Sequence, residues 1–235
     1  MDGYGVDRRR LIGAGMLVAG ATAVAGTSAM AQGSAAAGPA WTPATEPQDS
    51  WLDKPSTRHR MVFDSLSGEG GSEALGFANN FIHVNQSAYG LTPEQLGVVV
   101  IFRHMSTPYG YNNAVWAKYG KGFADKMKLK PDVAKRAATM NPLLTDMPPT
   151  EPTPPGMEWA NQYSLSDLAP KGVRFAVCGL ATKAIAGMIA GKTGNAAAIE
   201  AEFTSNLVPG ALIVPAGIST VNRAQEHGYS FAYIG

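Results

Sequence analysis

The single cysteine of the chain, Cys178, is the strongest candidate for chemistry. It ends the apolar run 172–178 and is followed by small residues, which predicts that it lies where a buried strand passes into a helix. A helix N-terminus favours the negative charge of a thiolate, and Lys183, about one turn into the helix, would add positive potential. A free cysteine is also often a buried structural residue, and without a second cysteine it could pair only with another chain. A reactive thiol, a structural thiol and an intermolecular pair therefore all stay open.

His104 and Met105 form a second candidate group, because they follow the apolar run 96–102. If this run and the one that ends at Cys178 are neighbouring parallel strands, both groups lie at the carboxyl edge of the sheet, where ligands bind in α/β proteins. His104 could then act as a base, bind an anion or, with Met105 beside it, ligate a metal or haem iron. A hydrogen-bonded histidine without a function is the alternative.

Aromatic and amide side chains follow closely: Tyr109, Tyr111, Asn112, Asn113, Trp116 and Tyr119. Such a cluster could wall a pocket or form an interface. Together with His104 and Met105, we expect Tyr109 and Trp116 to line a site for a small ligand or a haem-like cofactor, if the protein is a binding protein. Ordinary helix packing explains Trp116 equally well.

Other familiar sites lack the necessary spacing. The segment 187–193 resembles a phosphate-binding loop but has one residue too few between its glycines and follows a helix instead of a strand. The glycines at 68–71 do not have dinucleotide-binding spacing, the four histidines do not have zinc-ligand spacing, and the Gly-x-Ser-x-Gly pattern of hydrolases does not occur. The sequence therefore argues against a nucleotide site, a zinc site and classical hydrolase chemistry.

Strands and helices are predicted to alternate along the chain. The apolar patterns place strands at 59–64, 96–102, 172–178, 211–214 and 229–234, and helices at 72–89, 112–119, 180–190, 196–206 and 218–227. With right-handed crossovers, this order predicts an α/β protein with three α/β/α layers and a mostly parallel sheet of about five strands.

A long interruption at about 120–165 breaks this alternation. It contains a basic helical stretch at 131–140 and six prolines between residues 141 and 156. Loops of this length in a compact domain are usually functional or form a partner surface. An oligomeric structural or partner-binding module is therefore a further hypothesis.

The N-terminus has the features of a twin-arginine export signal at 1–31. Adjacent arginines, including Arg8 and Arg9, precede an apolar run at 11–25, and Ala29-Met30-Ala31 offers a peptidase site. The run is shorter than the roughly 20 residues of a transmembrane helix, so we expect the twin-arginine translocase as a partner, no membrane anchor and a periplasmic or otherwise exported protein. The proline-rich stretch 32–57 is predicted to be a flexible linker.

Bulk charge gives no reason to expect a nucleic-acid partner. The chain contains 19 Lys and Arg against 18 Asp and Glu, for a net charge of +1. Neutralising nucleic-acid phosphates requires a marked excess of basic residues.

Several segments of the C-terminal half resemble the DsrE/DsrF-like family: 172–179, 207–210, 214–218, 225–229 and 231–234. The resemblance is good over 168–235 and weaker over 58–119, and the rest of 58–235 is the insertion at about 120–165. It implies a small α/β/α fold that assembles into trimers or hexamers, and members of the family relay sulfur as a cysteine persulfide. Cys178 falls where the family often carries a cysteine, after the third strand. The expected function is thus an exported, sulfurtransferase-like sulfur carrier in which His104 and Lys183 support Cys178. A non-catalytic, oligomeric small-ligand or haem-binding protein is the alternative.

Overall fold

The computed structural model describes residues 41–145 and 153–235. The chain divides into two units, 1–42 and 43–235, and the description below concerns the second. The predicted signal at 1–31 and the first part of the predicted linker lie outside the described residues.

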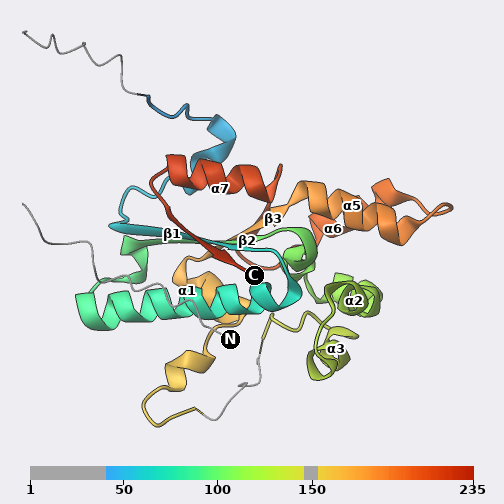
Figure 1. Ribbon diagram of the computed structural model, residues 1–235, viewed down its shortest axis with the longest axis horizontal. Helices are drawn as coiled ribbons and strands as arrows, with labels where there is room; N and C mark the ends of the chain where they lie inside the picture. Colours follow the sequence, from blue (N-terminus) through green and yellow to red (C-terminus); the bar gives the residue numbers. More distant parts are fainter. Residues whose placement is uncertain (1–40, 146–152) are drawn as a thin grey trace, which may run out of the picture. The chain divides into compact units, whose positions relative to one another are not determined.

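A five-stranded parallel sheet forms the centre of this unit (Figure 1), with the strands in the order β4-β3-β2-β1-β5. The strands are β1 His59–Ser65, β2 Leu96–Phe102, β3 Arg174–Cys178, β4 Ala211–Val214 and β5 Ser230–Ile234. All residues of β2 are buried, as expected for a continuous apolar run in the middle of a sheet that is covered on both faces. The predicted α/β fold with about five strands is confirmed.

Helices cover both faces of the sheet and make three layers (Figure 1). The α-helices are α1 Gly68–Tyr89, α2 Asn113–Met127, α3 Pro131–Ala137, α4 Leu165–Leu168, α5 Gly179–Ala190, α6 Ala196–Ser205 and α7 Gly217–Glu226. Short 3₁₀ helices are η1 Pro47–Leu52, η2 Pro93–Gln95, η3 His104–Gly110, η4 Glu158–Asn161 and η5 Ala169–Lys171.

The strand order explains which helix lies on which face. The chain moves in one direction through β1, β2, β3 and β4, so right-handed crossovers place α1 and α5 on the same face of the sheet. It then returns to the far side of β1 to form β5, and this reversed crossover places α7 on the opposite face. The helical layers are therefore unequal, with α7 accompanied by the N-terminal segment.

The beginning of the predicted insertion belongs to the core. Helix α2 continues past the predicted end at residue 119, because Gly120 allows close contact with α3: a Cβ atom there would collide with the carbonyl of Ala137. Asn141 is fully buried, and its Nδ2 donates to the carbonyls of Tyr109 and Tyr111 at 2.8 Å each. Residues 146–152 lie outside the described part.

The predicted flexible linker ends earlier than residue 57. Leu52, in η1, is fully buried against the face of the sheet that α7 covers. The hydroxyl of Tyr229 donates to the Leu52 carbonyl at 3.0 Å, and Lys54 Nζ donates to the Leu96 carbonyl at 2.9 Å. A buried leucine outweighs the local proline signal, so this segment is part of the folded unit. Within the described ranges, no helix has the length and apolar character needed to cross a membrane.

Candidate functional site

The carboxyl ends of β3 and β4 form the topological switch point of the sheet. The chain leaves β3 toward α5 on one face and leaves β4 toward α7 on the other, and such a divergence opens a crevice in α/β sheets. A depression of about 280 Å³ lies there. It is lined by Arg103, His104, Cys178, Leu180, Ala181, Ala216, Gly217 and Ile218.

Cys178 occupies the predicted position between strand and helix. It is the N-cap of α5, and its Sγ accepts a hydrogen bond from the backbone N–H of Ala181 at 3.5 Å. The side chain is 7% exposed and lines the depression. The helix N-terminus thus directs both an N–H group and its positive dipole end at the sulfur, which favours a thiolate over a thiol.

Arg103 lies across the depression and is held by Asp64. Its Nε and one terminal nitrogen donate to the two carboxylate oxygens at 2.6 and 2.8 Å. Asp64 is almost fully buried at the end of β1, so the guanidinium neutralises a carboxylate that has little access to water. The hydrogen bond to Asp64 is the main cause of the raised pKa of Arg103. Two of the five guanidinium N–H donors are used in this pair, and the others are available to a ligand.

His104 has a strained backbone at the rim of the depression. Its φ angle is 53°, in the left-handed region that residues other than glycine rarely adopt. The turn is fixed from the next residues, since the N–H groups of Met105 and Ser106 both donate to the Leu66 carbonyl. Strain of this kind costs on the order of 1 kcal/mol and is concentrated at functional sites. The side chain of His104 is exposed and lines the same depression as Cys178.

The remaining predicted site residues lie elsewhere. Lys183 is exposed on α5 and does not line the depression. Tyr109 and Trp116 are fully buried with their rings stacked at 5.8 Å between centroids. Tyr109 donates from its hydroxyl to the Gly68 carbonyl at 2.8 Å, and Trp116 donates from Nε1 to the Pro108 carbonyl at 2.9 Å. Burial raises the pKa of Tyr109. These two side chains have core positions, and the structure does not bring them together with His104 in one pocket.

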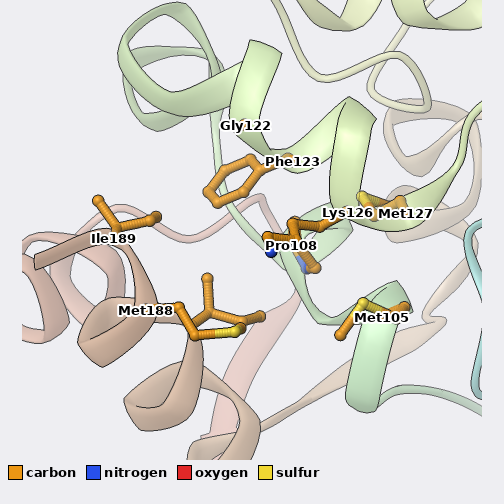
Figure 2. Close-up of a pocket in the computed structure, with 9 residues that line it drawn as sticks. Met105, Pro108, Gly122, Phe123, Lys126, Met127, Met188 and Ile189 are labelled. Atoms are coloured by element: carbon orange, nitrogen blue, oxygen red, sulfur yellow. The ribbon is translucent and has the colours of Figure 1, made fainter. Parts of the chain in front are cut away.

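Met105 lines a separate cavity of about 100 Å³ between α2 and α5 (Figure 2). Pockets for drug-sized ligands usually measure roughly 300 to 1,000 Å³, and no histidine lines this one. The residues present therefore do not fit haem. In the described part of the chain, no group of three or more His, Cys, Asp and Glu side chains is arranged to hold a metal ion.

Several residues of the depression escaped the sequence analysis. Asp64 and Arg103 stand at the ends of two predicted strands, and the shared carboxyl edge of parallel strands would have predicted their contact. Leu180 and Ile218 are 65% and 62% exposed in the first turns of α5 and α7, where they flank the depression. Their pairing depends on the opposite placement of the two helices and has no local signal.

No protein-family model matches the chain, and neither the curated proteins nor the solved structures contain a significant match.

Proposed function

We propose that the protein is an exported sulfur carrier of the DsrE/DsrF-like kind and that Cys178 carries the sulfur. The observation that supports this most strongly is the position of Sγ, which caps α5 inside the depression at the switch point of the sheet. The sulfur is there both stabilised as an anion and placed where α/β proteins bind their ligands.

The proposed reaction is an exchange at sulfur. The Cys178 thiolate attacks the sulfane sulfur of a donor, and a new S–S bond forms while the S–S bond of the donor breaks. The donor leaves with the electron pair, as a thiolate from a persulfide or as sulfite from thiosulfate. An acceptor thiolate then attacks the outer sulfur of the Cys178 persulfide, and Cys178 leaves as a thiolate. Neither step requires an external oxidant or reductant.

The surroundings of Cys178 suit an anionic donor. Arg103 has unused N–H donors on one side of the depression. The N-terminus of α7 opens onto it at Gly217, and the N-cap Ala216 has no side-chain group that could occupy the free N–H groups. We assign His104 as the group that accepts the thiol proton. Lys183 contributes a distant positive charge at most.

Assembly and export belong to the same proposal. We infer a homo-oligomer, a trimer or hexamer as in the family, because the edge strand β5 leaves Phe231 and Tyr233 42% and 52% exposed. Both side chains share the face of the sheet that α7 covers, since they pair in register with Val62 and Asp64. Exposed aromatic residues on an edge strand favour a protein contact. The twin-arginine pattern supports a periplasmic location.

Intact-mass measurement tests the sulfur-carrier proposal. Native protein is incubated with thiosulfate or glutathione persulfide, freed of small molecules and weighed. We expect wild type to gain the mass of one sulfur atom, which dithiothreitol removes, and Cys178→Ser to gain nothing. Lys183→Gln serves as the matched control on the same helix and should gain sulfur as wild type does.

Native alkylation by iodoacetamide provides an independent reading. A thiol in the open depression should be alkylated at pH 7 without denaturant, whereas a structural thiol reacts only after unfolding. Unchanged mass with both donors together with no native alkylation would disprove the role of Cys178.

A further inference from the structure

The cavity between α2 and α5 is distinct from the thiol depression. Figure 2 shows its walls: Phe123, Lys126 and Met127 from α2, Met188 and Ile189 from α5, and Met105 and Pro108 from η3. Gly122 and Ile185 complete the lining. The N-terminal turn of α5 contributes to the depression around Cys178, whereas its later turns face this cavity.

The lining is apolar except for one cation. Three methionines contribute flexible, polarisable side chains that adapt to irregular ligands. Lys126 is the only charged residue that lines the cavity. Among residues 41–145 and 153–235, no carboxylate forms an ion pair with it. An apolar chamber with an unneutralised ammonium group is complementary to a molecule that has an apolar body and one negative charge.

Gly122 leaves additional space at this wall. It lies inside α2, where glycine is unfavourable compared with alanine. A Cβ atom added there would meet no heavy atom within 4 Å. The glycine is therefore not required by helix packing at this point, and its effect is to leave the cavity open.

We propose that this cavity binds a short-chain aliphatic carboxylate, with the chain among the methionines and the carboxylate beside Lys126. The size of the chain follows from the volume. About 100 Å³ is somewhat less than the roughly 150 Å³ of an apolar protein cavity that takes up benzene, so a chain of about four to six carbons fills it. The site is independent of the sulfur chemistry at Cys178.

Titration of protein labelled with ¹³C in the methionine methyl groups tests the proposal. We expect hexanoate to shift the signals of Met105, Met127 and Met188 and to leave the other methionine signals in place. Each methylene added from butyrate to hexanoate should strengthen binding about fourfold, which corresponds to about 0.8 kcal/mol per buried CH₂. Hexylammonium, with the same chain and the opposite charge, should bind more weakly than hexanoate.

Two pairs of measurements separate the chain site from the charge site. Gly122→Leu should abolish the shifts because the new side chain occupies the cavity, whereas Gly187→Leu is the control. Gly187 also has free space around it, but it does not line the cavity. Lys126→Gln should weaken hexanoate binding roughly threefold, as for an exposed ion pair, and should not change binding of 1-hexanol.

Three results would overturn the proposal. The first is the absence of shifts at these methionines with hexanoate. The second is binding that persists in Gly122→Leu. The third is a change of the same signals with protein concentration alone, because a second copy of the chain would then cover the cavity.

Discussion

Replacing Gly217 by alanine tests how closely α7 must approach the central strand β2. Gly217 is the first residue of α7 and lines the depression beside Cys178. A Cβ atom at this position would lie 2.7 Å from Arg103 Cβ and 3.0 Å from Ile101 Cγ2. Carbon atoms in good contact are about 3.5 to 4.0 Å apart, so the added methyl group is short of space by close to 1 Å.

The neighbours of this methyl group have little freedom to move away. Ile101 is fully buried in β2, which lies between β1 and β3. Arg103 is held by two hydrogen bonds to Asp64. Overpacking of this kind typically costs about 1 to 3 kcal/mol, and the better helix propensity of alanine returns at most about 1 kcal/mol. We therefore expect Gly217→Ala to lower the free energy of unfolding by about 1 to 2 kcal/mol.

Gly76→Ala is the matched control for this experiment. Gly76 lies in the middle of α1, and a Cβ atom there meets nothing within 4 Å. The same substitution should raise the free energy of unfolding by about 0.5 to 1 kcal/mol. Urea unfolding followed by circular dichroism measures both variants, with equal m-values as the condition for comparison. If Gly217→Ala is as stable as Gly76→Ala or more so, the close approach of α7 to β2 is refuted.

Three further predictions concern the N-terminus and the edge of the sheet. Leu52→Ala should cost about 2 to 5 kcal/mol in urea unfolding because the side chain is fully buried, whereas Leu180→Ala, at an exposed position, should change stability by less than about 0.5 kcal/mol. Changing Arg8 and Arg9 to lysine should abolish export, because lysine does not reproduce the paired guanidinium groups; normal periplasmic yield in cell fractionation would contradict the export signal. Phe231→Ser combined with Tyr233→Ser should lower the mass measured by light scattering to that of one chain, and a wild type that is already monomeric would rule out the oligomer.

Local sequence patterns were sufficient for the elements of the sheet and for one residue of the site. The run 96–102 predicted a strand covered on both faces, and all residues of β2 are buried. The change from the β-branched run before Cys178 to the small residues after it marked the boundary between β3 and α5. Such features are readable because burial and backbone preference act within a few neighbouring residues.

Apolar or glycine-containing segments were harder to interpret from sequence. Trp116 and Tyr109 have the composition of a pocket wall, but their polar atoms are satisfied by backbone carbonyls inside the core. Gly120 predicted a helix end, although it serves a close contact between α2 and α3. Leu52 stands in a proline-rich stretch, yet it is buried. In each case a partner distant in sequence decides the role of the residue.

By itself, the sequence determined the alternation of strands and helices, the class of fold and the position of Cys178 at the end of a strand. Only the tertiary structure decided that β5 lies beside β1 and that α7 therefore covers the opposite face from α5. That decision creates the crevice between the two helix N-termini and brings Arg103 and Gly217 to the thiol. The physical reason is that strand order depends on packing between segments far apart in the chain, whereas periodicity reports only how each segment is buried.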